Sequence, residues 1–516
     1  MSIGRRSFLR QMASGAFVAV VAGCSDNQPS TRATSAGDAG HSGMHDHSVR
    51  LPEGAVLPDD VAVLAAEQRR IATGAITTRH TLVAQTGSVD IGGRVITTAT
   101  FGGTLPGTTL RGSTGDLVAI ALENRLDEPT AIHWHGLSVR NDMDGVLGVT
   151  QPGIAPGETF DYTFALPSPG THWYHSHAGL QLDRGLYAPF IIDDPDDSTD
   201  YDLEHIIVLD DWIDGFGATP NELFDELRCQ PTCENDKWLG KFSSDLLGGD
   251  AGSINYPAYL LNGRMHTDPD SITAAPGTRV RLRIINAAAE TVFHFAVNGH
   301  ALLVTHTDGN AIEPVEADSL VLSVGERFDA IITVGSGVFP IVAIAEGKQA
   351  VAAGVLRSSD TSPDATPAPT VPQRLPEHDR RLADIRTMRT RRGTPFDFGS
   401  ADLTYDVTLS GGNGNYQWRL NGETYGDNGS LTVHEGQRVR LNIVNTSNIW
   451  HPMHLHGHAY RVGTKPDSVI KDTLLVKAGE THTIDVICNN PGQWMLHCHN
   501  AYHFEAGMAI PFSYLD

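Results

Sequence analysis

Three ten-residue segments of this chain follow one pattern, and that repeat limits the folds open to it. The segments are GDLVAIALEN (115–124), GTRVRLRIIN (277–286) and GQRVRLNIVN (436–445). Each begins with Gly, places apolar residues three, five and seven positions later, and ends with Asn. Because alternate residues of a strand share one face, each segment predicts a strand with one buried face. Short strand-like runs broken by Gly, Pro, Asn and Asp surround the copies, so we expect three β-sandwich domains of similar design.

The first and third copies are followed by paired histidines that the middle copy lacks. One His-x-His pair begins nine residues after the closing Asn, in HWHG (133–136) and in HLHG (454–457). A second pair ends the motif Pro-Gly-x4-His-x-His, in PGTHWYHSH (169–177) and in PGQWMLHCH (491–499). In a strand, each pair presents both imidazoles on one face.

Neutral imidazole is a ligand for copper, zinc, iron and nickel. Four pairs placed symmetrically in two repeats therefore predict a cluster of three metal ions between the first and third domains. The eight expected ligands are His133, His135, His175, His177, His454, His456, His497 and His499.

The segment HCHNAYHFEAGM (497–508) places Cys498 between two of these histidines. If they face the cluster, the cysteine must point the other way, into the third domain. Two imidazoles, one thiolate and a weak thioether form a blue-copper electron-transfer site. We expect that site beside the cluster, joined to it by a short covalent path, because the chain offers Cys498 the partners His451, His503 and Met508. Ser176 holds the matching position in the first domain, which is therefore expected to lack the site.

The stretches HWHG, YHSH, HPMHLHGH and HCHNAYHFEAGM resemble the four copper motifs of the multicopper oxidases, a laccase-like family. The resemblance covers about residues 80–516. RNDMDG (140–145) and LDDWIDG (209–215) look closer still to exported actinobacterial members, including the mycobacterial lipoprotein type linked to copper tolerance. The fold that the resemblance implies is all-β, with three consecutive cupredoxin-like Greek-key β-sandwich domains.

The resemblance further implies four copper ions per chain, with ligands for each. The type 1 ion would be held by His451, Cys498 and His503, with Met508 axial. The type 2 ion would take His133 and His454. The type 3 pair would divide six histidines, with His135, His175 and His499 on one ion and His177, His456 and His497 on the other. These coppers would couple one-electron oxidations of a substrate to the four-electron reduction of dioxygen to water.

Forming water consumes protons, so an acid is expected near the cluster. Asp144 occupies the place where the family carries such an aspartate, and the alternative is a turn residue before Gly145. Glu505 is a second candidate, although some relatives carry the acid directly after the second type 1 histidine, where this chain has Phe504. We expect His172 and His458 to be structural rather than ligands.

The N-terminus predicts export. GRRSFLR (4–10) is a twin-arginine signal, and the apolar stretch that follows is too short to span a bilayer comfortably. It ends in VAGC, which resembles a lipobox and makes Cys24 the expected lipid-anchored residue in the cell envelope. An ordinary cleaved signal is the alternative. The predicted order is signal 1–24, His-containing tether and lead-in 25–79, first domain 80–199, middle domain without copper ligands 200–357, linker 358–396 and third domain 397–516.

The other cysteines read differently. Cys229 and Cys233, in RCQPTCEN, are expected to form a small-loop disulfide in an oxidising compartment, with metal binding as the minor alternative. Cys488 lies in an apolar run and is expected to be buried.

The net charge and the number of methionines favour some binding partners and substrates over others. The formal net charge of -24 argues against nucleic acid and suits a chain that attracts cations. Cuprous ion and phenolic compounds are the candidate reductants. Export and acidity favour cuprous ion, while the presence of only nine methionines argues against it. We expect a monomer. The competing hypotheses are a copper-sequestering protein, an envelope scaffold that has lost its coppers, and a copper nitrite reductase.

Overall fold

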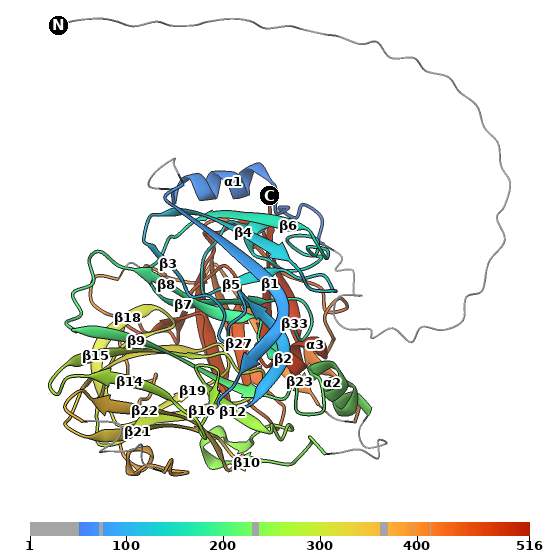
Figure 1. Ribbon diagram of the computed structural model, residues 1–516. Coiled ribbons are helices and arrows are strands. Elements are labelled where there is room, and N and C mark those ends of the chain that lie inside the picture. The colour runs from blue at the N-terminus through green and yellow to red at the C-terminus, as the bar shows by residue number, and fades with distance from the viewer. Residues whose placement is uncertain (1–50, 72–75, 230–236, 362–369, 395, 413) are drawn as a thin grey trace, which may run out of the picture. The chain divides into compact units, whose positions relative to one another are not determined.

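The three repeated segments form three equivalent strands, β4 (Leu117–Asn124), β15 (Arg279–Asn286) and β26 (Arg438–Asn445). Each lies inside a sheet, between a parallel neighbour and an antiparallel one. The structure, a computed structural model, describes residues 51–71, 76–229, 237–361, 370–394, 396–412 and 414–516. Its strands form three consecutive cupredoxin-like β-sandwich domains, as predicted (Figure 1).

The closing asparagine of each repeat has the same task in all three domains. The amide of Asn124 donates to the carbonyl oxygens of Glu128 and Ile154, while its own oxygen accepts from the backbone N–H of Leu126. Asn286 and Asn445 make the same three kinds of bond in their domains. A buried side-chain amide that satisfies a turn explains why the repeat ends in Asn.

The first domain packs two four-stranded sheets. One contains, in order, β2 (Val95–Phe101), β1 (Thr78–Asp90), β4 and β6 (Thr159–Ala165). The other contains β3 (Leu110–Ser113), β8 (Tyr187–Asp193), β7 (Gly170–Ser176) and β5 (Ile132–His135). The histidine pairs of this domain belong to the second sheet.

The middle domain is larger. Its seven-stranded sheet runs β13 (Arg264–Met265), β12 (Ala258–Leu261), β9 (Leu203–Trp212), β15, β20 (Arg327–Thr333), β17 (Leu302–Thr307) and β18 (Asn310–Ala317). Its five-stranded sheet runs β14 (Asp270–Ala274), β22 (Ala350–Ser358), β21 (Val338–Ala345), β16 (Phe293–Val297) and β19 (Leu320–Leu322). A hairpin of β10 (Ser243–Ser244) and β11 (Gly249–Asp250) precedes β12.

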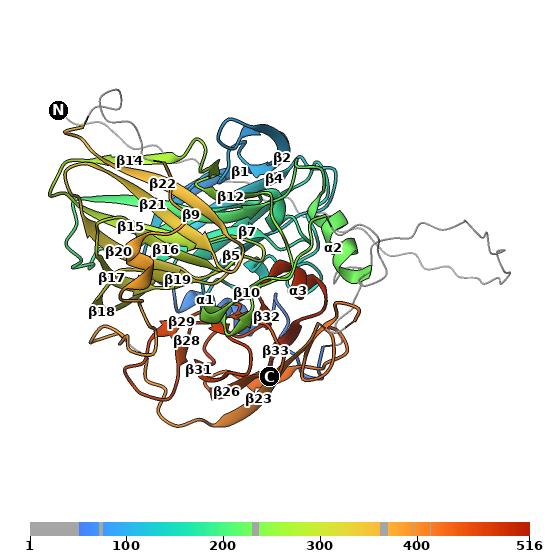
Figure 2. The ribbon, with the colours of Figure 1, turned by 90° about the horizontal axis from the view of Figure 1, so that it is seen from below.

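The third domain repeats the design of the first. One sheet runs β24 (Trp418–Leu420), β23 (Leu403–Gly411), β26, β31 (Thr481–Ile487), β28 (Tyr460–Val462) and β29 (Ile470–Lys471). The other runs β25 (Leu431–His434), β33 (Ala509–Leu515), β32 (Gln493–Cys498), β27 (His451–Leu455) and β30 (Thr473–Val476). Viewed from below, the strands of this domain lie beside those of the middle domain (Figure 2).

The prediction of one buried face per repeat is confirmed for β4 and β26, in which alternate residues are buried. It is incomplete for β15, which is buried on both faces. The reason is that the polar face of β15 is covered as well. Arg281 and Arg283 are buried there and pair with Asp329, and Arg283 also donates to Thr171 of the first domain.

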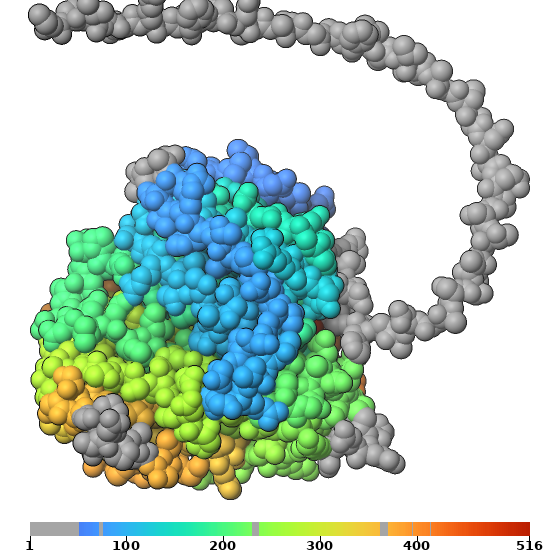
Figure 3. Space-filling model, viewed as in Figure 1, coloured from blue at the N-terminus to red at the C-terminus, as the bar shows by residue number. Residues whose placement is uncertain are grey.

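The α-helices of the described residues are short, and the last of them is buried along its whole length. They are α1 (Val61–Gln68), α2 (Pro220–Cys229) and α3 (Ala501–Glu505). In the space-filling view, the N-terminal segments cover the upper part of the face shown and the middle-domain segments lie below them (Figure 3). Among the described residues, no helix has the length and apolarity needed to cross a membrane. The twin-arginine signal, Cys24 and the histidine-containing stretch 25–50 lie outside the described residues.

Part of the predicted linker, residues 370–394, is described. It contains a 3-10 turn (Pro376–Asp379) and pairs with the middle domain through the bridges Ile312–Thr390 and Ser319–Leu382. This stretch is therefore held along the edge of the middle domain on its way to the third.

Candidate metal centre

Two pairs of antiparallel strands carry the His-x-His motifs, and both use the same register. In the first domain β5 pairs with β7, so that His133 lies opposite His175. In the third domain β27 pairs with β32, so that His454 lies opposite His497. Each strand pair therefore presents four imidazoles from one surface, as the alternation of side chains requires.

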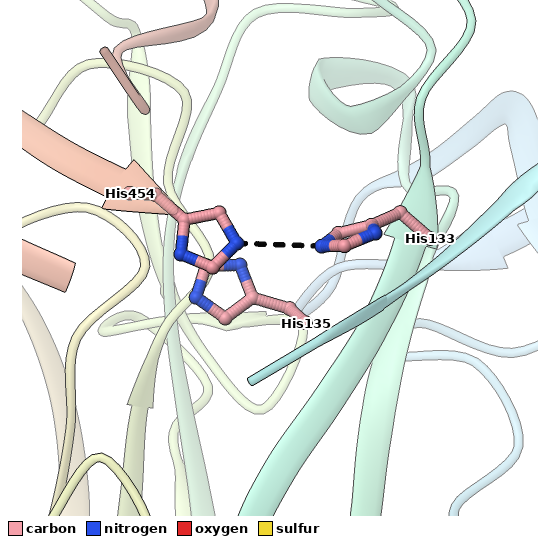
Figure 4. Close-up of side chains that lie close together, drawn as sticks. All are labelled: His133, His135 and His454. Atoms are coloured by element: carbon pink, nitrogen blue, oxygen red, sulfur yellow. Dashed lines mark hydrogen bonds between the residues drawn. The ribbon is translucent and has the colours of Figure 1, made fainter. Parts of the chain in front are cut away.

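These two surfaces face each other, and the eight histidines converge on one buried volume, the shared cluster. Nε2 of His133 lies 3.4 Å from Nε2 of His454, beside His135 (Figure 4). Nε2 of His456 lies 3.0 Å from Nε2 of His497. The ring nitrogens fall into sets within 4.8 Å of one another, each set drawing on both domains: His133, His135 and His454; His135, His175 and His499; His177, His456 and His497.

The shared cluster is built to hold cations. Burial, reinforced by neighbouring imidazoles, lowers the pKa of seven of its histidines below the usual value, which keeps them neutral: His135, His175, His177, His454, His456, His497 and His499. A neutral imidazole is the form that binds metal. Nε2 of His175 is buried without a hydrogen-bond partner among the described residues, although its Nδ1 is satisfied by the carbonyl oxygen of Ser176. Copper ions fit this donor set.

Two aspartates orient ligands from the outside, and they do so symmetrically. The main-chain oxygen of Asp144 accepts from Nδ1 of His133 (3.0 Å), and its carboxylate accepts from Nδ1 of His456 (2.9 Å). The main-chain oxygen of Asp472 accepts from Nδ1 of His454 (2.8 Å), and its carboxylate lies 3.1 Å from Nε2 of His135. Each aspartate thus holds one histidine of its own domain and one of the other domain, which fixes the tautomers.

Asp144 was singled out from the sequence, whereas Asp472 was not. The side chain of Asp472 is almost fully buried and belongs to the run VIKDTLLV (469–476). Two adjacent charged residues, Lys471 and Asp472, inside an otherwise apolar strand pattern were the available signal, because buried charges are rare unless they are paired.

A second donor set, the Cys498 site, lies behind the shared cluster in the third domain. Nδ1 of His451 lies 3.1 Å from Nδ1 of His503, and the sulfur of Cys498 lies 3.5 Å and 3.6 Å from these two nitrogens. Nε2 of His451 is bonded to Ser447 Oγ at 2.8 Å, which leaves Nδ1 to face the sulfur. Met508 is fully buried, and its carbonyl oxygen accepts from the N–H of Cys498.

The cysteines differ in environment. Burial raises the pKa of the Cys498 thiol, so a metal bound there has to displace a proton. Cys488 is buried, as predicted, and burial raises its pKa to about 12, which makes it inert. Cys229 is disulfide-bonded, and its predicted partner, Cys233, lies outside the described residues.

The matching position of the first domain has no metal donors around it among the described residues. Ser176 Oγ lies 2.7 Å from Oε1 of Gln181 and 3.3 Å from Oγ1 of Thr130. His458 is also accounted for without a metal, because its two nitrogens bond to the carbonyl oxygen of His456 and to the hydroxyl of Tyr514. His172 takes no part in the metal-binding sets found in the described part of the chain.

Aromatic side chains enclose both sites. The ring of Trp173 lies 4.5 Å from that of His175, and Phe504 lies 4.9 Å from the ring of His177. Trp418 lies 4.2 Å from the ring of His503. Next to Trp418, Tyr416 lines a cavity of about 760 Å³ together with Lys241, Asp250 and Asn448, so this cavity borders the surroundings of the Cys498 site.

Comparison with known proteins agrees with this geometry. The multicopper oxidase family matches residues 83–197, 237–361 and 400–516. The chain is 42% identical to multicopper oxidase MmcO of Mycobacterium tuberculosis over 88% of its own length and 90% of the relative. It is 27% identical to copper resistance protein A of Escherichia coli, covering 82% of this chain and 90% of that protein.

Solved structures agree as well. A point mutant of the laccase from Botrytis aclada superposes with a TM-score of 0.71 at 26% identity, over 86% of this chain and 89% of that one. Fet3p, a multicopper oxidase that functions in iron import, gives 0.71 at 21% identity, over 85% of this chain and 90% of that one, and this likeness concerns the fold alone.

The chain belongs to the multicopper oxidase family. It is a copper-dependent oxidoreductase that uses dioxygen as electron acceptor, as expected from its motifs.

Proposed function

We propose that the Cys498 site is the type 1 copper site, with Met508 as axial ligand, and that the shared cluster holds the other three coppers. The type 2 ion is assigned to His133 and His454. The type 3 pair is assigned to two triads, His135, His175 and His499 on one ion and His177, His456 and His497 on the other. One observation carries the proposal: eight buried imidazoles from two domains converge on one volume directly behind Cys498.

Bound copper would supply one-electron transfer at the Cys498 site and dioxygen reduction at the shared cluster. The protein holds the donor atoms in place and excludes water from them. Because Cys498 lies between His497 and His499, its sulfur is joined to both imidazoles by a short covalent path. Trp173 and Phe504 pack against the histidines and keep water away from them.

Asp144 is proposed as the group that supplies protons for water formation. Its Oδ2 accepts from His456. Its Oδ1 lies 3.1 Å from Nδ1 of His133, but that nitrogen bonds to the main-chain oxygen of Asp144, so Oδ1 has no hydrogen-bond partner among the described residues and is open to carry a proton. Glu505 remains the second candidate. It lies at the end of α3, while the neighbouring Phe504 makes the ring contacts with His177 and His497.

The reductants that we propose are cuprous ion and phenolic compounds. Copper resistance proteins among the relatives favour cuprous ion and a role in copper tolerance. The cavity beside Tyr416 favours an organic compound, since about 760 Å³ accommodates a small-molecule ligand and the described residues that line it include no methionine. Initial rates of oxidation of cuprous ion and of a phenol, measured at the same enzyme concentration, show which of the two reductants the protein oxidises faster.

We also propose that the chain is exported through the twin-arginine pathway, anchored in the cell envelope through acylated Cys24, and monomeric. The domain limits are proposed as 80–199, 200–357 and 397–516, with a linker over 358–396. The sequences GRRSFLR and VAGC support export and anchoring. Membrane fractionation of cells producing the wild type or Cys24→Ser tests the anchor, which is refuted if both chains stay in the membrane fraction.

The visible spectrum and copper-to-protein ratio of the copper-loaded chain test the copper assignment. We expect an intense blue band and four coppers per chain, and loss of the blue band in Cys498→Ser. A colourless wild type that still binds copper would contradict the type 1 assignment and favour a copper-sequestering protein.

A further inference from the structure

Arg327 belongs to the middle domain, which supplies no histidine to the shared cluster. It nevertheless contacts Asp472, one of the two aspartates that hold the cluster histidines. It begins β20 and is completely buried. Its guanidinium forms a two-pronged salt bridge with Asp472 of the third domain, with Nη1–Oδ1 and Nη2–Oδ2 distances of 2.6 Å each. Its Nε donates to the carbonyl oxygen of Thr171 in the first domain. One side chain therefore contacts all three domains.

The chain leaves room for this guanidinium. A Cβ added to Gly136, the glycine of HWHG, would lie 2.3 Å from Nη2 of Arg327 and 2.7 Å from Oδ2 of Asp472. Gly136 also has a φ of +84°, which favours glycine. Gly325, two residues before Arg327, lies against the cluster itself, since its added Cβ would come within 3.1 Å of His135 and 3.2 Å of His499. The turn that carries Arg327 is thus packed directly on two ligands.

The other contacts of Asp472 show what the salt bridge accomplishes. Its Oδ1 lies 3.1 Å from Nε2 of His135, so that nitrogen carries the hydrogen and Nδ1 faces the cluster, 3.0 Å from Nε2 of His499. This arrangement is the reverse of that in His133, His454 and His456, whose Nδ1 atoms face outward. Nε2 of His135 also lies 3.0 Å from Oγ1 of Thr473, whose hydroxyl donates to the same Oδ1 of Asp472. The position of the Asp472 carboxylate therefore sets both polar contacts of His135 on this side.

Asp472 is also fixed from the opposite side. Its N–H and that of Thr473 both lie 3.2 Å from Oδ2 of Asp308, a middle-domain residue that also accepts from the N–H of Arg327. Although burial opposes the charged form, the carboxylates of Asp472 and Asp308 raise the pKa of Arg327 above its usual value. A guanidinium that is permanently charged and planar fixes the plane of a carboxylate, which a lysine cannot do.

We propose that Arg327 is a positioning residue for the copper cluster: by clamping Asp472, it holds His135 in the orientation that presents Nδ1 to the metals. The middle domain then helps to orient a copper ligand, although it supplies no proposed ligand itself. The inference rests on the proposed assignment of His135 as a copper ligand.

The test compares copper retention in the full chain carrying Arg327→Lys with that of the wild type. Lysine keeps the charge and loses the second bond to the carboxylate. We expect the shared cluster to bind copper about 10- to 100-fold more weakly in competition with a chelator, the usual effect of changing a residue that hydrogen-bonds a metal ligand. The blue band should remain, because the Cys498 site does not contact Arg327. Because the main-chain oxygen of Asp472 accepts from His454, a proposed type 2 ligand, the electron paramagnetic resonance of the type 2 ion should change in parallel.

Arg281→Lys is the matched control. Arg281 is another buried middle-domain arginine with two bonds to one carboxylate, that of Asp329, and it has no contact with Asp472. It should retain copper as the wild type does. Equal copper loss in Arg281→Lys and Arg327→Lys would overturn the proposal, since the effect would then be general destabilisation, and so would unchanged retention in Arg327→Lys.

Asp472→Asn provides an independent variant if Arg327→Lys fails to fold. It preserves size and removes the charge that both Arg327 and His135 use, so it should show the same loss of cluster copper with the blue band retained. In the double variant, the two losses should not add, because both act through one contact. Additive losses, or normal copper retention in Asp472→Asn, would refute the proposal. A wild type without a blue band would instead refute the copper assignment itself.

Discussion

The first and third domains present the same pair of histidine strands, and yet only the third carries a donor set beyond the shared cluster among the described residues. Their registers are equivalent, with His133 opposite His175 and His454 opposite His497. The residue between the second pair of histidines differs. Ser176 faces the side chains of Gln181 and Thr130, whereas Cys498 faces two imidazoles. The strand scaffold therefore fixes where the histidines point, and the side of the strand turned away from them decides whether a second site exists.

A second contrast runs between the two aspartates that support the cluster. Asp144 and Asp472 use the same scheme, with a main-chain oxygen on one histidine and a carboxylate on another. Asp472 is clamped by Arg327, while Oδ1 of Asp144 has no hydrogen-bond partner among the described residues. One scaffold thus provides a carboxylate clamped by a guanidinium on one side and a carboxylate that makes polar contacts only with imidazoles among the described residues on the other.

The sharpest way to break the first contrast is to exchange the two residues. We expect Cys498→Ser to abolish the blue band and to stop oxidation of every reductant, because the only thiolate of the site is lost. Ser176→Cys should create no blue band, since its neighbours are an amide and a hydroxyl rather than imidazoles. Visible spectra of both variants after copper loading decide the matter, and a blue band in Ser176→Cys would show that the scaffold alone suffices.

The next largest effect concerns the apo-protein at low pH. In the folded chain, seven cluster histidines have a pKa below the ordinary value of about 6.5, mainly because of burial. Above that pH both the folded and unfolded chains are neutral at these sites, and stability is unaffected. Below it, only the unfolded chain takes up protons, so each histidine lowers the free energy of unfolding by about 1.4 kcal/mol per pH unit.

The free energy of unfolding of a domain is typically roughly 5–15 kcal/mol. Seven such histidines can lower it to zero within about two pH units below their ordinary pKa, so we expect the apo-protein to unfold near pH 5. Copper-loaded protein should resist to a lower pH, because metal binds only the folded chain. Thermal melts of both forms from pH 7 to pH 4 measure this. A melting temperature of the apo-protein that stayed constant down to pH 4 would contradict the neutral-histidine interpretation.

Much of this arrangement could be predicted from the sequence, because it depends on local periodicity. Strand alternation places the two histidines of each pair together and turns Cys498 away from them, and the same argument separates the first domain from the third. The repeat ending in Asn is equally local, since each asparagine bonds to residues of its own domain.

What could not be predicted depends on contacts between domains. Arg327 lies 145 residues from Asp472 in the chain, and no periodicity connects a middle-domain turn to a third-domain carboxylate. The second buried face of β15 has the same origin, because Arg283 reaches Thr171 of the first domain. The cavity beside Tyr416 is likewise assembled from separate segments of the middle and third domains.

The contrast between the aspartates predicts different losses from the same substitution. Asp144→Asn retains an oxygen that can accept from His456, so copper content should remain normal, while dioxygen reduction slows about 100-fold for want of a proton donor. Asp472→Asn should instead lose cluster copper. Copper analysis and oxygen consumption between pH 5 and pH 8 distinguish the two variants. Normal turnover in Asp144→Asn would remove Asp144 as the proton donor and leave Glu505 to be tested.

The smallest expected effect tests whether the cavity serves organic reductants. Asn448 is an exposed residue that lines the cavity and lies three positions before His451. Asn448→Trp should obstruct the cavity and lower kcat/KM for a phenol about tenfold, a loss that corresponds to about 1.4 kcal/mol. The rate with cuprous ion should change less than about twofold, because one ion needs far less room than a ligand that fills such a pocket. Asn448→Ala, which leaves the cavity open, is the matched control and should behave as the wild type with both reductants. Equal losses with phenol and cuprous ion in Asn448→Trp would mean that both reach the Cys498 site by one route, and that cavity size does not separate them.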